Sequence, residues 1–176
     1  MYTLRLTRAL LAQFESVDQE GAPESVLPTT RLGDWYVKPF DNGRRQLLLC
    51  TSERSLLSVV MPVDDLADLP ERLVTALVGV LRRLGVPQDA IVAEVDAMTS
   101  GDIGAASDGS TLGSMRGLAE RARAFLEASR GDIDVAALYT HLGEYRSRGA
   151  SQTAAARATA LLTARRVKPA RRDDRP

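Results

Sequence analysis

The sequence has little of what sulfur and imidazole chemistry require. Cys50 is the only cysteine and His141 the only histidine among 176 residues. A single cysteine forms no disulfide within the chain, which fits a reducing compartment. Zinc sites take several cysteine or histidine ligands, so one chain of this composition does not build one. We therefore expect no metal, no cofactor and a cytoplasmic location.

Aromatic residues and long apolar runs are also scarce. Aromatics make up 5% of the chain, so the core should consist mostly of Leu, Val, Ala and Ile. No apolar run approaches the roughly 18 residues that span a bilayer, and the first residues lack a signal-peptide cleavage pattern. The sequence predicts a soluble protein that makes no membrane contact.

Net charge is zero over the whole chain, but its two ends differ. From Gln152 onward there are seven Lys or Arg and two acids, so the preceding residues carry 16 bases and 21 acids. This asymmetry predicts an acidic body with a basic C-terminal end.

Hydrophobic periodicity predicts an α+β fold with a small antiparallel sheet of about four strands, mostly in the N-terminal half. Alternation over residues 2–6 indicates a first strand, followed by helical spacing and a polar loop over 15–30. Asp41-Asn42-Gly43 is typical of a hairpin turn. Three further strands of an antiparallel meander are predicted over residues 34–40, 44–51 and 55–63.

Helical spacing replaces the strand pattern after Pro62. Residues 100–114 form a Gly/Ser-rich, hairpin-like segment between the predicted helices. We expect one domain over residues 1–166, with helices dominating its C-terminal half, and a disordered basic tail over 167–176. The predicted helices cover residues 65–85, 86–98, 115–128, a segment starting near Asp132 or Asp134, and 151–166.

Five stretches together resemble an uncharacterised bacterial family of a domain of unknown function. They read LRLT, TTRLGDWY, LLLCTSERSLL, LGVPQDAI and LGSM, and the similarity covers roughly residues 2–128. The resemblance implies an α+β fold and a small cytoplasmic protein, and supplies no activity, cofactor or catalytic residue. The chain departs from the family pattern after Met115, where Asn-Asp-Phe is usual. Residues 129–166, predicted to be helical, lack the family's Thr-Pro-Cys segment.

Residues 29–40, TTRLGDWYVKPF, concentrate the candidate functional side chains. Arg31, Asp34, the only tryptophan, Trp35, and Tyr36 stand within six positions. One interpretation is structural: Trp35 packs in the core, and Arg31 and Asp34 order the entry to a strand. The other is functional: Arg31 and Asp34 line the mouth of a pocket with an aromatic wall, where arginine contacts carboxylate or phosphate. Both interpretations stay open at this point.

Other candidates rest on shorter patterns. Glu53 and Arg54 link two apolar strands, where both are solvated or Glu53 folds toward Arg31. Ser114 precedes a predicted helix as an N-cap or part of an anion site, but its neighbours match neither a nucleophile elbow nor a phosphate loop. His141 serves as a base only with a partner and a pocket, and is otherwise a surface or packing residue.

These patterns predict a non-catalytic module that binds a partner protein or small ligand through residues 15–34 and the adjacent sheet end. Whether the chain is an enzyme stays open, because a metal- or arginine-assisted hydrolase or nuclease using Arg31, Asp34 and Glu53 is an alternative. A third hypothesis is weak, non-specific nucleic-acid association through the basic C-terminal end. The residues that would carry it are Arg165, Arg166, Lys168, Arg171 and Arg172.

Overall fold

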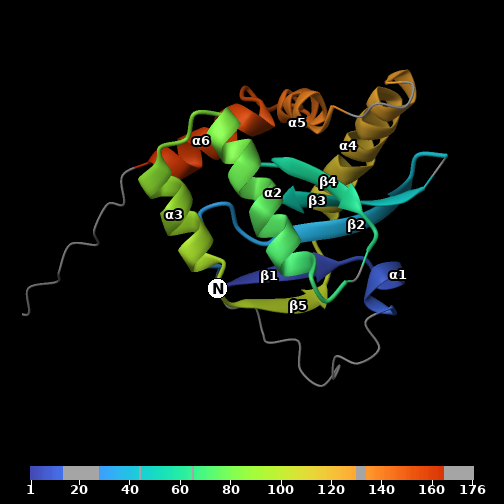
Figure 1. The fold of residues 1–176 in the computed structure, drawn as a ribbon, viewed down its shortest axis with the longest axis horizontal. Helices are drawn as coiled ribbons and strands as arrows, with labels where there is room; N and C mark the ends of the chain where they lie inside the picture. The colour runs from blue at the N-terminus through green and yellow to red at the C-terminus, as the bar shows by residue number, and fades with distance from the viewer. Residues whose placement is uncertain (14–27, 44, 65, 130–133, 165–176) are drawn as a thin grey trace, which may run out of the picture.

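The chain forms one mixed β-sheet with helices on both faces (Figure 1). The computed structural model describes residues 1–13, 28–43, 45–64, 66–129 and 134–164. Most of the predicted loop over 15–30, Asp132 and the whole predicted tail lie outside these residues. Within the described ranges the strands are β1 (Tyr2–Leu6), β2 (Trp35–Asp41), β3 (Gln46–Ser52), β4 (Ser58–Pro62) and β5 (Gly101–Ala105).

Six helices accompany the sheet in the described part of the chain. They are α1 (Arg8–Leu11), α2 (Leu69–Arg83), α3 (Gln88–Ala97), α4 (Gly109–Ala128), α5 (Val135–Gly143) and α6 (Ala154–Thr163). None of these helices is long and apolar enough to cross a bilayer. The predicted α+β class is confirmed.

The sheet has the strand order β4-β3-β2-β1-β5, and its pairing is mixed. Strands β2, β3 and β4 form the predicted antiparallel meander. Strand β1 lies between β2 and β5 and runs parallel to both, with Leu4 opposite Trp35 and Ile103. The sheet has five strands where about four were predicted, and β1 is parallel to both neighbours where antiparallel pairing was predicted. Both parts of the prediction are therefore wrong, because β1 pairs with strands far along the chain.

Strand β5 replaces the hairpin-like segment predicted over residues 100–114. Its sequence, GDIGA, contains two glycines, which weaken the strand signal. The glycine at 101 has a packing reason, because a Cβ there would lie 2.6 Å from a ring carbon of Tyr2. Gly101 thus lets the Tyr2 ring lie against the β5 backbone, an arrangement that only the tertiary structure reveals.

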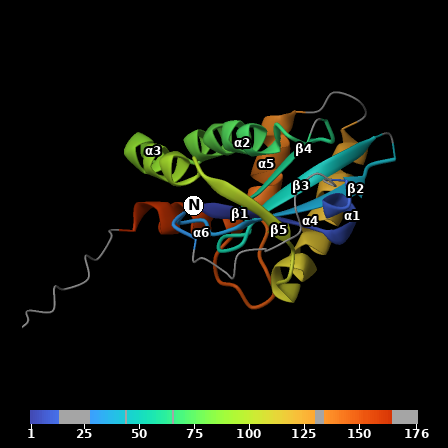
Figure 2. The ribbon, with the colours of Figure 1, turned by 90° about the horizontal axis from the view of Figure 1, so that it is seen from below.

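One face of the sheet carries the main hydrophobic core. Trp35 and Leu4 belong to it, together with buried residues of α2, α3 and α6. Figure 2 shows α2 and α3 on this side of the sheet and α4 on the other. On the second face α4 and α5 cover a smaller cluster built on Tyr36, Phe40 and Leu49. No residue of β1 or β5 belongs to that second cluster. On this face, α4 and α5 therefore cover only the part of the sheet formed by β2, β3 and β4.

Two helices begin where carboxylates cap them. Helix α4 starts at Gly109, not near residue 115, because the Asp108 side chain accepts hydrogen bonds from the amides of Ser110 and Thr111. Ser114 therefore lies inside the helix, and its predicted N-cap role is wrong. Asp134 caps α5 in the same way, through the amides of Ala136 and Ala137.

Candidate functional site

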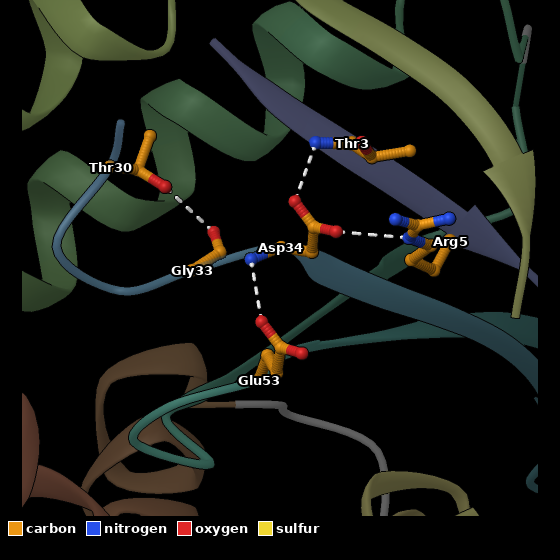
Figure 3. Close-up of polar contacts among 6 residues, drawn as sticks. All are labelled: Thr3, Arg5, Thr30, Gly33, Asp34 and Glu53. Carbon is orange, nitrogen blue, oxygen red and sulfur yellow. Dashed lines mark hydrogen bonds and ion pairs between the residues drawn. The ribbon is translucent and has the colours of Figure 1, made fainter. Parts of the chain in front are cut away.

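Asp34 joins the loop before β2 to strand β1. Its carboxylate accepts a hydrogen bond from the backbone N–H of Thr3 at 2.9 Å and one from Arg5 Nε at 2.9 Å (Figure 3). The Asp34 side chain is 6% exposed and the Arg5 side chain 17%, so this ion pair is largely shielded from water. Such pairs matter most when broken, because a buried charge is then left without a partner.

Glu53 approaches the same loop from the turn between β3 and β4. Its Oε2 accepts a hydrogen bond from the backbone N–H of Asp34 at 3.3 Å. Figure 3 shows Glu53 on the amide side of Asp34, while the Asp34 carboxylate turns toward β1. Gly33 adopts φ +80°, and a Cβ there would lie 2.8 Å from Glu53 Oε2. Glu53 therefore packs on a position where only glycine fits.

Arg31 points away from this pair of acids. Its Nη1 donates hydrogen bonds to the carbonyl oxygens of Leu161 at 3.1 Å, Leu162 at 3.0 Å and Ala164 at 2.5 Å. These carbonyls belong to the last turn of α6 and to Ala164 just beyond it, where a cation offsets the helix dipole. We call this arrangement the Arg31 clamp. Within it, Arg31 fastens the loop before β2 to the end of α6.

Glu94 of α3 contacts the backbone of the same loop. Its two carboxylate oxygens accept hydrogen bonds from the backbone amides of Arg31, at 2.8 Å, and Leu32, at 3.0 Å. Glu94 is 2% exposed. Burial raises the pKa of its carboxyl above the ordinary value, while the hydrogen bonds from Leu32 and Arg31 act in the opposite direction. Burial prevails because it penalises the charged form.

The two aromatic residues lie on opposite faces of β2. Trp35 is fully buried in the main core, and its Nε1 has no hydrogen-bond partner among the residues that the structure describes. Tyr36 is 3% exposed in the second cluster, and burial, followed by the charge of Glu53, raises the pKa of its hydroxyl. The Trp35 indole therefore forms part of the core and lines no open cavity.

Arg54 contacts the same loop and donates from Nη1 to the carbonyl of Thr30 at 3.2 Å.

The structure thus brings Asp34 and Glu53 to one segment of backbone and directs Arg31 elsewhere. Sequence reasoning missed two residues that hold this segment, Arg5 and Glu94. Arg5 alternates with apolar residues in β1, and Glu94 stands three positions after Ile91 on the buried side of α3. Both patterns could have identified these two residues from the sequence. No three His, Cys, Asp or Glu residues gather as a metal site in the part of the chain that the structure describes.

The remaining candidates take part in packing. Ser114 lies half-buried inside α4. The His141 ring centroid lies 5.2 Å from that of Phe125, and its backbone carbonyl accepts a hydrogen bond from Arg121 Nε at 2.8 Å. Burial and then the Arg121 charge lower the pKa of His141. Burial raises the pKa of the Cys50 thiol to about 12, so the reactive thiolate is strongly disfavoured.

A groove of about 610 Å³ runs beside strand β4, between α2 and α5. We call it the β4 groove. Its apolar lining includes Val60, Met61 and Ala76, and Val135 of α5 stands at its side with 47% of its surface exposed. Three carboxylates and one guanidinium from the α2 side also line it: Asp64, Asp68, Glu71 and Arg72.

The free edge of β4 is closed by side chains that line this groove. The Tyr139 hydroxyl donates to the carbonyl of Val60 at 3.0 Å, and Arg72 Nη2 donates to the carbonyl of Pro62 at 2.6 Å. Pro62 itself has no backbone N–H to offer. These devices block the pairing of a further strand, as proteins commonly do at sheet edges.

Comparison with known proteins identifies a family. Residues 3–153 match the model of a domain of unknown function, DUF6933, which confirms the resemblance to an uncharacterised family. The match extends beyond residue 128, where the quoted similarities end. Neither a curated protein nor a solved structure matches the chain.

Proposed function

We propose that this chain, which belongs to the DUF6933 family, a domain of unknown function, is a non-catalytic interaction module. Its partner binds in the β4 groove. The single observation that carries the proposal is the groove itself. Its volume of about 610 Å³ falls within the range of about 300–1,000 Å³ that ligand sites occupy. Its lining combines five apolar residues with six that carry a polar or charged side chain, so it can contact both kinds of group on a partner.

The contacts at the sheet end support a structural role for most residues of that region. Arg31 donates to two carbonyls of α6 and to that of Ala164 just beyond it. Asp34 binds Thr3 and Arg5, and Glu53 binds the amide of Asp34. A group already satisfied inside the protein must lose that contact before it binds a ligand, and this costs free energy. We therefore propose that this region holds the loop, and that binding takes place beside β4.

The hydrolase alternative receives less support from the same contacts. It requires Arg31, Asp34 and Glu53 around one substrate, whereas the Arg31 guanidinium lies at the end of α6. Nucleic-acid association rests on residues 165–172, outside the described residues, and stays a prediction. A cytoplasmic location and a single domain over residues 1–166 remain part of the proposal.

Affinity capture with a matched pair of variants tests the proposed function. Val135 in the groove and Val92 on α3 are exposed to nearly the same extent, 47% and 46%. Val135→Asn should reduce the recovery of a partner identified by mass spectrometry several-fold, because an apolar contact is lost. Val92→Asn should recover it like the wild type. Equal recovery of every partner by both variants would place binding outside the groove.

A further inference from the structure

The charge around the β4 groove points to the chemistry of its occupant. Resting on the proposed function, we propose that the groove binds an extended basic segment of a partner protein. Lysine or arginine side chains of the segment contact Asp68 and Glu71, and an aliphatic side chain between them lies against Val60 and Val135. The partner is thus defined by basic side chains on both sides of an aliphatic one.

The carboxylates of the groove differ in how far they are already neutralised. Asp64 lies 3.3 Å from Arg72 Nη2, so that pair is internally compensated. Asp68 and Glu71 are exposed and have no cationic partner among the residues described. They stand three positions apart, so they project from one side of α2. The two together present a negative charge that a cationic side chain would compensate.

Helix α2 alone accounts for only part of this arrangement. Acids in a first turn interact favourably with the helix dipole, and Asp68 and Glu71 occupy such positions. The dipole does not explain why apolar residues of the same groove lie beside them, with Val135 of α5 nearly half exposed. A groove lined by both acids and apolar residues matches a segment that carries both cations and aliphatic groups.

The edge of β4 decides how such a segment binds. Tyr139 and Arg72 already occupy the carbonyls of Val60 and Pro62, so the segment cannot add as a sixth strand through these groups. Arg72 also lines the groove, but its Nη1 is buried and is not presented to a bound segment. Recognition therefore depends on the side chains of the segment.

The attraction between the groove and a basic segment should depend on salt. Asp68 and Glu71 are exposed, and salt screens the interaction between exposed charges. Binding of the segment should therefore weaken as the ionic strength rises.

Calorimetric titration of the full chain with short synthetic peptides tests the proposal. The probe is acetyl-Gly-Arg-Arg-Val-Lys-Lys-Gly-amide. One control peptide replaces its four bases with glutamine, and a second replaces its valine with glycine. We expect the basic peptide to bind at low salt at least tenfold more tightly than the glutamine peptide and several-fold more tightly than the glycine peptide.

Variants of the protein assign this binding to the groove. Asp68→Asn with Glu71→Gln removes two charges while keeping the size of each side chain, and asparagine remains a good N-cap residue. This variant should bind the basic peptide about tenfold more weakly, the equivalent of about 1.4 kcal/mol. Glu120→Gln with Glu127→Gln makes the same change on exposed positions of α4 and should leave binding unchanged. Thermal unfolding followed by circular dichroism verifies that both variants fold.

The possible outcomes separate this proposal from the proposed function. Equal binding of the basic and glutamine peptides, or equal binding to both double variants, overturns the basic segment. Preference for the glutamine peptide overturns it too and assigns the groove to a neutral segment. If Val135→Asn still loses a captured partner in those cases, the proposed function stands with a different occupant.

Discussion

The Arg31 clamp makes a measurable contribution to stability. Arg31→Ala removes the hydrogen bonds from Nη1 to the carbonyls of Leu161, Leu162 and Ala164. A hydrogen bond that involves a charged group contributes about 1.5–3 kcal/mol. A cation at a helix C-terminus adds about 0.3–1 kcal/mol. Because one nitrogen serves three carbonyls and water reaches part of the site, we expect a loss of about 2 kcal/mol in total.

This loss has two readouts. A change of 1 kcal/mol moves the melting temperature of a domain this size by about 2–4 °C, so the expected decrease is about 4–8 °C. Urea unfolding followed by circular dichroism gives the free energy directly. Hydrogen exchange should show faster exchange in the last turn of α6, because that turn loses its anchor.

Arg157→Ala is the matched control. Arg157 is exposed on the same helix, so its replacement should change the free energy of unfolding by no more than about 0.5 kcal/mol. If Arg31→Ala unfolds at the same urea concentration as Arg157→Ala, the clamp does not stabilise the fold. Arg31 would then become available again as a binding residue.

Three further predictions concern the loop that precedes β2. Asp34→Asn should lower the free energy of unfolding in urea by about 1–3 kcal/mol, because it leaves the shielded Arg5 guanidinium without a countercharge; an unchanged urea midpoint would contradict this. Gly33→Ala should lower the melting temperature, because the residue has φ +80° and the new Cβ meets Glu53 Oε2 at 2.8 Å; an unaffected melting temperature would refute the crowding. Burial raises the pKa of Glu94 above 4.5, so above that pH the folded chain keeps a proton that the unfolded chain has lost. The stability of the wild type relative to Glu94→Gln should therefore fall as pH rises from 4.5 toward neutrality. A constant difference between the urea midpoints of the two proteins over that range would contradict this prediction.

Local patterns in the sequence were enough for the meander of the sheet. The turn at Asp41-Asn42-Gly43 and the apolar runs after it identify neighbouring antiparallel strands, whose pairing needs only a short connection. Strand β5 was missed because Gly101 and Gly104 lower its strand signal. Its pairing with β1 depends on residues about a hundred positions away, such as Leu4 and Ile103.

The candidate site shows the same limit. The sequence singled out Arg31 and Asp34 by residue type, but each finds its partner through the fold. Leu161 lies 130 positions from Arg31, and Arg5 lies 29 positions from Asp34. No local pattern encodes such distances, and the β4 groove likewise combines a strand and two helices from separate parts of the chain.

The position of β1 between two parallel neighbours affects how the protein is made. Strand β1 leaves the ribosome before the other described strands, and its partner β5 begins only at Gly101. At about 5–20 residues per second, the ribosome needs about 5–20 s to synthesise the intervening chain. During this interval one side of β1 has no native neighbour, so completion of the sheet must wait until β5 has been synthesised.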